Sequence, residues 1–151
     1  MKPSSRALIG LALAACALSA SAQFQAQPKL PTIRLNADIQ NIPTEVASTP
    51  EQRQTGMMFR TAMAPNDAML FVFEEPSQQC FWMKNTLVPL SAAFVKDDGT
   101  IANIVDMKPQ TTDSHCSTEP VRYVLEMNQG WFGKHGVKAG SKLRGEPFAR
   151  R

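Results

Sequence analysis

Apolar and polar residues alternate along several short segments of this chain, and a two-residue alternation is typical of β-strands with one buried face. Glycine, proline, aspartate and asparagine punctuate these segments, as they do between the strands of small β proteins. The pattern predicts strands near residues 32–35, 39–46, 68–73, 80–84, 89–95, 100–105, 121–127 and 142–143. We therefore expect a mainly β fold (β-rich α+β), with the short strands forming a single compact β-barrel-like domain.

Five of these segments carry more detail. Residues 68–73 are apolar at every position, which indicates a central strand buried on both faces. Asp97-Asp98-Gly99 predicts a hairpin turn between 89–95 and 100–105. Pro43 is expected to interrupt the strand at 39–46, because proline has no N–H for the ladder. In the segment 121–127 the alternation places Val121, Tyr123, Leu125 and Met127 inward. It places Arg122, Glu126 and Asn128 outward.

One short helix is predicted near residues 50–57. Thr49 can cap it, Pro50 suits its first position, and Gln52 stands where the partner of a capping box belongs. Gly56 lies near its end. A second helical turn is expected over 130–135.

The segment Cys80–Thr86 predicts a strand that ends in a polar turn at Asn85 and Thr86. Successive side chains of a strand point to opposite faces, so Phe81 and Met83 would enter the core. Trp82 and Lys84 would then share the other face with the Cys80 thiol. An aromatic side chain beside a cation forms a candidate binding surface.

Residues 1–22 resemble an export signal. Lys2 and Arg6 precede an apolar run, and Ala20-Ser21-Ala22 offers a cleavage site before Gln23. In the alternative, Leu13-Ala14-Ala15-Cys16 acts as a lipobox and the protein is a lipoprotein anchored through Cys16. The expected organisation is a signal peptide at 1–22, a flexible leader at 23–31, the barrel domain at 32–145 and a basic tail at 146–151, in a protein that is periplasmic or secreted.

Charge and cysteine content narrow the function classes. The chain has 16 basic and 13 acidic residues, and loss of Lys2 and Arg6 leaves 14 against 13. A net charge near +1 gives no basis for binding nucleic acid. Cys80 and Cys116 remain as an even pair, which in an oxidising compartment predicts a disulfide; a metal pair with His115 and two free thiols are the alternatives. We expect no metal, no cofactor, no transmembrane segment after signal removal, and a monomer.

Candidate ligand contacts follow from side-chain chemistry. Guanidinium, ammonium and amide groups bind carboxylates, sulfates and hydroxyl groups. A disulfide at Cys80 would also bring the loop 108–120 over the face of Trp82, where its polar residues 111–115 could line a shallow cleft. The candidate ligand-binding residues are Arg60, Trp82, Lys84, Asn85, Thr86 and Asn128, and the weak candidate for a catalytic carboxylate is Glu126. As structural alternatives, Arg60 pairs with Glu126 or Asp67, and Asn85 bonds to turn backbone.

Several short motifs stand out along the chain. They are Thr49-Pro50-Glu51, Gly56-Met57-Met58-Phe59-Arg60, Met69-Leu70-Phe71-Val72-Phe73, Phe81-Trp82-Met83-Lys84-Asn85-Thr86, Pro89-Leu90, Leu125-Glu126-Met127-Asn128 and Gly136-Val137-Lys138-Ala139-Gly140. In this order and spacing they resemble the domain-of-unknown-function 192 family over about residues 33–145. That resemblance implies a small β-barrel with a short helix, often exported, in a family with no established activity. Members commonly carry an aspartate after the Pro-Leu pair, where this chain has Ser91.

The sequence leaves three functions open. The leading hypothesis is a non-catalytic exported module that binds a small polar or anionic ligand, a glycan or an envelope protein through the face of Trp82 and Lys84. The second is a small hydrolase or lyase that uses Glu126 with Lys84 and Asn85. The third is a structural accessory of the envelope. A cleft that brings Glu126 within hydrogen-bond reach of Lys84 or Asn85 would favour the enzyme, and an open Trp82 shelf would favour binding.

Overall fold

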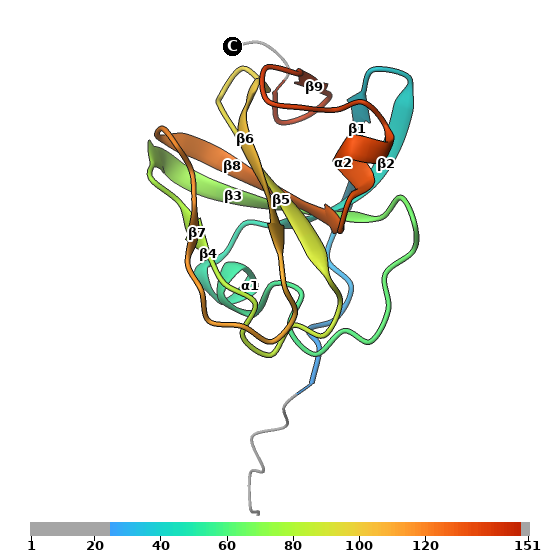
Figure 1. Cartoon of the computed structure of the whole chain (residues 1–151), viewed down its shortest axis with the longest axis vertical. Helices are drawn as coiled ribbons and strands as arrows, with labels where there is room; N and C mark the ends of the chain where they lie inside the picture. The colour runs from blue at the N-terminus through green and yellow to red at the C-terminus, as the bar shows by residue number, and fades with distance from the viewer. Residues whose placement is uncertain (1–24, 149–151) are drawn as a thin grey trace, which may run out of the picture.

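A curled seven-stranded sheet organises residues 25–148, the part of the chain that the computed structural model describes (Figure 1). Its strand order is β6-β5-β8-β3-β2-β1-β9, and a separate two-stranded sheet pairs β4 with β7. The strands are β1 Thr32–Ala37, β2 Gln40–Ala47, β3 Ala68–Ser77, β4 Cys80–Phe81, β5 Leu90–Val95, β6 Ile101–Met107, β7 His115–Cys116, β8 Val121–Asn128 and β9 Leu143–Arg144; the helices are α1 Pro50–Thr55 and α2 Trp131–Lys134. The predicted mainly β fold is confirmed, as a half-barrel with two short helices.

Strand pairing follows the predicted turns. β5 and β6 form the expected hairpin, with Leu90 opposite Met107. β3 lies in the middle of the sheet, as its apolar sequence predicts. A bridge between Thr100 and Lys142 brings the β6 and β9 edges together at one end, which partly closes the barrel.

The expected interruption at Pro43 is wrong. β2 runs through Pro43, which stands opposite Arg34 of β1. On its other side β2 pairs with β3 in parallel, and that ladder begins only at Thr44. Pro43 therefore sits beyond the β3 ladder, where its missing N–H interrupts no bond to β3.

Apolar cores cover both faces of the sheet. The first core packs α2 and the barrel interior around Leu35, Ile42, Leu70, Leu125, Met127, Trp131 and Phe132. The second core, on the α1 side, gathers Ala47, Met57, Met69, Phe71, Met83, Leu90, Ala92, Phe94, Met107 and Val124. The outward placement of Glu126 is consequently wrong: the face opposite Leu125 is also covered, and only 4% of Glu126 is exposed.

Helix α1 forms as its cap predicts. The Gln52 N–H donates to the Thr49 hydroxyl at 3.2 Å, and the Thr49 N–H donates to the Gln52 side chain at 3.1 Å, completing a capping box. Gly56 ends the helix with a φ of +48°, and a Cβ there would stand 3.1 Å from the Phe71 ring. Glycine thus lets the helix end pack directly on the second core.

The predicted signal, its cleavage site at Ala22, the alternative at Cys16 and the last three residues of the basic tail lie outside the described residues. Part of the predicted leader contacts the domain: the Gln27 amide donates to the Gly56 carbonyl at 2.9 Å. Within 25–148, no helix is both long and apolar enough to cross a membrane.

Candidate functional site

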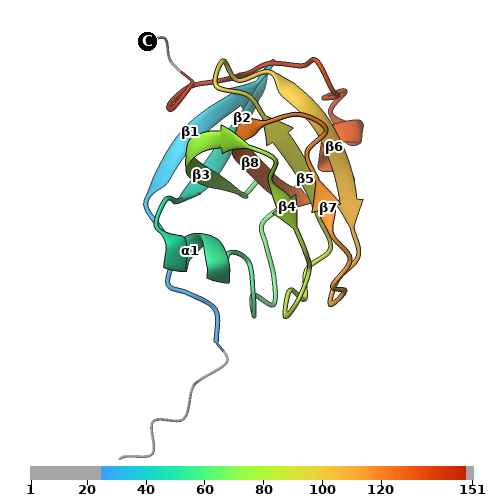
Figure 2. The same ribbon diagram turned by 90° about the vertical axis from the view of Figure 1, so that its left-hand side faces the viewer.

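A cleft of about 700 Å³ opens over the second core. One wall is α1 with the segment that follows it to Phe59, and the other is β4 with the segment that follows it to Thr86; Figure 2 shows α1 and β4 on the same side of the molecule. The centre of the sheet contributes Phe71 and Phe73 of β3 and Glu126 of β8. The lining residues are Gln25, Arg53, Gln54, Thr55, Gly56, Met57, Met58, Phe59, Phe71, Phe73, Gln79, Cys80, Phe81, Trp82, Lys84, Asn85, Thr86 and Glu126.

Aromatic rings form much of the cleft surface. Phe81 packs edge-on against Phe71, with ring centroids 4.8 Å apart, and also against Phe73 and Phe94. These contacts fix Phe81 to the second core. Trp82, the next residue, points the other way and stays 49% exposed.

The cation beside Trp82 is where the sequence predicted it. The Lys84 ammonium lies 5.4 Å from the centroid of the Trp82 ring, a cation–π distance. Met83 is fully buried between these two exposed residues. The strand predicted to reach Lys84 ends at Phe81, however, because the chain then turns and the Met83 N–H donates to the Thr111 carbonyl of the neighbouring loop.

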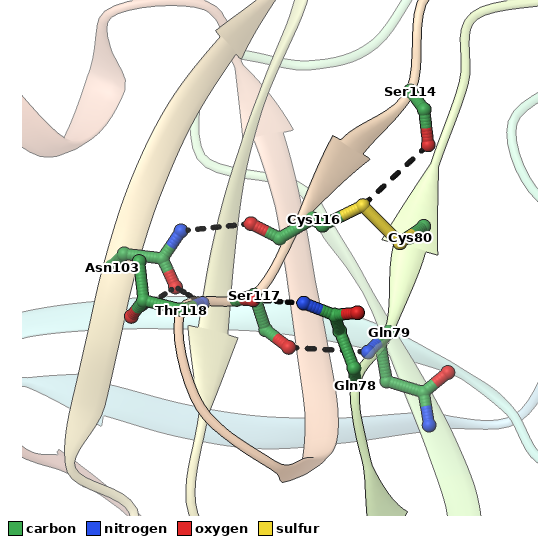
Figure 3. Close-up of a disulfide and its surroundings, with 8 residues drawn as sticks. All are labelled: Gln78, Gln79, Cys80, Asn103, Ser114, Cys116, Ser117 and Thr118. Carbon is green, nitrogen blue, oxygen red and sulfur yellow. Dashed lines mark hydrogen bonds between the residues drawn. A yellow bond between two sulfur atoms is a disulfide. The ribbon is translucent and has the colours of Figure 1, made fainter.

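The predicted disulfide between Cys80 and Cys116 is present (Figure 3). It joins directly opposed residues of β4 and β7. Side chains extend this contact on both sides: the Gln79 N–H donates to the Ser117 hydroxyl at 3.1 Å, and the Asn103 amide donates to the Cys116 carbonyl at 3.2 Å. The bond therefore ties the β4 wall of the cleft, from Gln79 to Thr86, to the loop 108–120. That loop runs beside the wall, but the expected cleft-lining residues 111–115 are not among those that line the cleft.

Two non-glycine residues with left-handed backbone meet where the cleft walls join. Phe59 has a φ of 64° and Asn85 a φ of 55°. The Phe59 N–H donates to the Asn85 carbonyl at 2.8 Å, which links the two walls. Asparagine tolerates this region, whereas phenylalanine rarely adopts it, and such conformations concentrate at functional sites.

Glu126 lies at the cleft floor. It stands opposite Met69 of β3 and Ala92 of β5, both in the second core. Among the described residues none forms a hydrogen bond or an ion pair with its carboxyl group. Burial, the single cause of the shift, raises the pKa of Glu126 to about 8, so the group is mostly protonated at neutral pH.

Arg60 is not part of the cleft lining. Its guanidinium binds the Glu45 carboxylate through two hydrogen bonds, of 2.6 and 2.8 Å, in place of the predicted partners Glu126 or Asp67. Burial raises the pKa of Glu45, but the bonds from Arg60 and from the Leu30 N–H outweigh burial and leave that pKa below its ordinary value. The hydrogen bonding of its guanidinium to the Glu45 carboxylate is the main reason that the pKa of Arg60 is raised.

The remaining predicted residues divide between the cleft and other places. Asn85 and Thr86 line the cleft, and the Thr86 hydroxyl donates to the Lys84 carbonyl at 3.2 Å. Asn128 does not line it, because its amide donates to the Ala64 carbonyl at 2.8 Å. The cleft thus brings together Trp82, Lys84, Asn85, Thr86 and Glu126, and leaves out Arg60 and Asn128.

Ser91 lies away from the cleft. Its neighbours in β5, Leu90 and Ala92, belong to the second core, so Ser91 faces the opposite side of the sheet. There its hydroxyl donates to the Asp106 carboxylate at 2.5 Å and accepts a hydrogen bond from the Gly130 N–H at 2.9 Å. The position where relatives commonly carry aspartate therefore cannot supply a carboxylate to the Glu126 site.

The sequence does not predict the α1 wall of the cleft, which runs from Arg53 to Phe59 and is called the inner wall below. In the sequence the run from Gly56 to Phe59 carries only a family motif, and no local pattern marks Arg53. A signal was available: Gly56, Phe71 and Glu126 all stand in motifs shared with the family, yet they lie on three different elements. Only the fold shows that these motifs meet.

The fold and the cleft define a class, a small half-barrel domain with a binding-site-sized hollow between its short helix α1 and the segment that runs from β4 to Thr86. Residues 32–145 match the family model DUF192, described as "Uncharacterized ACR, COG1430", and the chain belongs to that family. The predicted resemblance is confirmed.

Two solved structures are similar to this chain. A Sinorhizobium meliloti protein described as a candidate transcription regulator is 40% identical, with a TM-score of 0.70 over 74% of this chain and 90% of that one. A Novosphingobium aromaticivorans protein of unknown function is 29% identical, with a TM-score of 0.74 over 77% of this chain and 86% of that one. No curated protein matches the sequence.

Proposed function

We propose that this protein is an exported, non-catalytic module that binds a small polar ligand in the cleft, with Trp82 and Lys84 as its outer contacts. The observation that carries this proposal is the combination of a half-exposed indole at the rim with a buried carboxyl group at the floor of one hollow. Clefts of about 300–1,000 Å³ with aromatic walls and a few polar groups are typical small-molecule sites. At about 700 Å³, this cleft falls within that range.

Binding is better supported than hydrolysis or lyase chemistry. The hydrolase or lyase that the sequence leaves open uses Glu126 together with Lys84 and Asn85, so it needs Glu126 within hydrogen-bond reach of one of them. Within residues 25–148, no hydrogen bond connects Glu126 with Lys84 or Asn85, and the Asn85 carbonyl is engaged by Phe59. The indole of Trp82 remains open, which is the arrangement expected of a binding shelf.

The chemistry of the rim favours a ligand with a flat or ring-shaped body and polar substituents. The Trp82 face can stack on such a body, and Lys84 can bind an oxygen atom of it. Gln79, Asn85 and Thr86 add amide and hydroxyl groups along the same wall. A glycan unit and a small anion-bearing molecule both fit this description.

Export is part of the proposal. The Cys80–Cys116 bond supports it, because disulfides persist mainly in oxidising compartments such as the periplasm. The Sinorhizobium relative is described as a candidate transcription regulator, but the net charge of this chain does not favour DNA binding. After signal removal it has 14 basic and 13 acidic residues, which is not the positive excess that binds DNA.

A ligand screen on residues 23–151 tests the proposal. Amide chemical shifts would report compounds that perturb the segment 82–86, and each hit would be titrated against Trp82→Ala and Lys84→Ala. We expect Trp82→Ala to weaken binding about tenfold or more. Lys84→Ala should weaken it with almost no loss of stability, since an exposed charge contributes about 0–1 kcal/mol.

Ile39→Ala is the matched control, because Ile39 is 83% exposed and does not line the cleft. It should leave affinity unchanged. Unchanged affinity in both cleft variants would disprove the ligand site, and product formation from any hit would favour the hydrolase or lyase. A screen without hits in this segment would favour a structural role in the envelope.

A further inference from the structure

Two buried carboxyl groups on the same side of the sheet have different surroundings. Glu45 of β2 and Glu126 of β8 both stand opposite Met69 of β3, one from each side. Glu45 receives the two hydrogen bonds of Arg60 and one from the Leu30 N–H at 2.8 Å. Glu126 is as deeply buried, with 4% exposed against 6% for Glu45, but no described residue is bonded to it.

The cations that line the cleft do not serve Glu126. The Arg53 guanidinium of α1 donates to the carbonyls of Ser48 and Val72 and lies 5.1 Å from the Phe73 ring centroid. The Lys84 ammonium lies over Trp82 at the rim. Met69 and Ala92, which flank Glu126 in β3 and β5, are uncharged. From β7, His115 stands opposite Phe81 in the ladder and is not among the lining residues.

We propose that the ligand of this cleft carries a cationic nitrogen group that donates hydrogen bonds, such as an amine, amidine or guanidinium. That group would occupy beside Glu126 the place that Arg60 occupies beside Glu45. The inference rests on the proposed function and deepens it by naming the ligand class.

The physical reason is the cost of an unpaired buried carboxyl group. In the free protein Glu126 avoids that cost by keeping its proton. A ligand cation replaces the proton with a charge-assisted pair, which is the stronger form of hydrogen bond. The rings of Phe71, Phe73 and Phe81 around the same hollow also attract cations through their faces. An anionic group at the floor would gain none of these contacts, although Lys84 could bind an anionic end at the rim.

Three probes of almost the same shape separate these chemistries: benzamidinium, which is cationic and planar, benzamide, which is neutral, and benzoate, which is anionic. Titration followed by amide chemical shifts gives the three dissociation constants. At pH 8 we expect benzamidinium to bind about tenfold or more tightly than benzamide, the change produced by one well-formed charged pair. Benzoate should bind more weakly than benzamide at the floor.

Linkage gives a second readout. Below pH 8 the carboxyl group must lose its proton to pair with benzamidinium, so affinity should fall about tenfold between pH 7 and pH 6. Calorimetry in two buffers of different ionisation enthalpy should show close to one proton released per benzamidinium bound at pH 6.5, and none for benzamide. Lysine and arginine side chains keep their charge over this range.

Glu126→Gln should abolish the preference for benzamidinium, the pH dependence and the proton release, while benzamide binding persists. Glu51→Gln is the control, because Glu51 is an exposed carboxylate of α1 outside the lining. Equal affinity for benzamidinium and benzamide in the native chain would overturn the inference but leave the ligand site standing. Proton release that persists in Glu126→Gln would also overturn it, because the proton would then come from a group other than Glu126. The proposed function itself is judged by the Trp82→Ala and Lys84→Ala titrations, which do not depend on the charge of the probe.

Discussion

The Glu45 region and the cleft each bury one carboxyl group, on either side of Met69, but only Glu45 is paired with a cation. Strands in a sheet lie about 4.8 Å apart, so the two acids are separated by roughly 10 Å. On the Glu45 side the chain supplies its own cation, and the pKa falls below its ordinary value. On the cleft side no cation of residues 25–148 bonds to Glu126, and burial raises its pKa. Burial alone therefore does not decide the state of an acid here; the presence of Arg60 does.

The largest expected change in the free energy of unfolding comes from removing the disulfide on the cleft side. The Cys80–Cys116 disulfide spans 36 residues, and closing a loop of that length restricts the unfolded chain by about 4 kcal/mol in the entropy model. Urea unfolding of the double variant Cys80→Ser with Cys116→Ser should show a loss approaching that value. The Arg60–Glu45 pair should survive, since it belongs to the other region. A loss below about 1 kcal/mol would mean that the cleft wall does not depend on the bond.

The second prediction removes the Arg60–Glu45 pair. Arg60→Met should destabilise the protein by about 3 kcal/mol, because it leaves a buried carboxylate without its partner. Chemical denaturation at pH 7 measures this. Arg34→Met, at an exposed arginine of β1, is the control and should change stability by less than about 0.5 kcal/mol. Equal effects of the two variants would contradict the claim that Glu45 needs its cation.

The third effect separates the two acids by pH. Glu126 has a raised pKa, so the native state holds its proton between about 4.5 and about 8 while the unfolded state releases it. Its contribution to stability is complete below about pH 4.5 and is lost as pH rises, at up to about 1.4 kcal/mol per pH unit. Glu45 has a lowered pKa, so its contribution is present above about pH 4.5 and is lost in acid.

Unfolding curves of the native chain and Glu126→Gln between pH 5 and pH 8 isolate the first of these terms. The stability difference between the two proteins should change across that range in favour of Glu126→Gln. A constant difference would show that Glu126 is ionised in the folded protein throughout, which the absence of a bonded partner in residues 25–148 argues against.

Local signals made most of the fold predictable. Alternation located the strands, Asp97-Asp98-Gly99 located the hairpin, and the Thr49 cap located α1 within two residues of its end. These features depend on neighbours in the sequence. The same is true of the exposed Trp82 and Lys84 around the buried Met83.

The floor and inner wall of the cleft depend on distant contacts, and here the sequence misled. The alternation of β8 predicts one solvent-exposed face, but α1 and the segment from β4 to Thr86 cover that face, so Glu126 lines a hollow instead of facing solvent. Arg60 stands 15 residues from Glu45, on a different element, and no periodicity connects them. Which acid a given arginine reaches is decided by sheet order, which the hydrophobic pattern does not encode.

The parallel pairing of β2 with β3 has a consequence for how this site can diversify. Parallel neighbours cannot be joined by a tight turn, so the chain must cross the sheet between Ala47 and Ala68, carrying α1 with it. That crossing segment is the inner wall of the cleft from Arg53 to Phe59. Because it is a connection, it can change in sequence without disturbing the register of any strand, whereas Glu126 is held in the most densely paired part of the sheet. The topology thereby separates a floor held by strand register from a wall that lies in a connection, so substitutions at Arg53, Gln54 or Thr55 can alter what the cleft recognises while Glu126 stays in place.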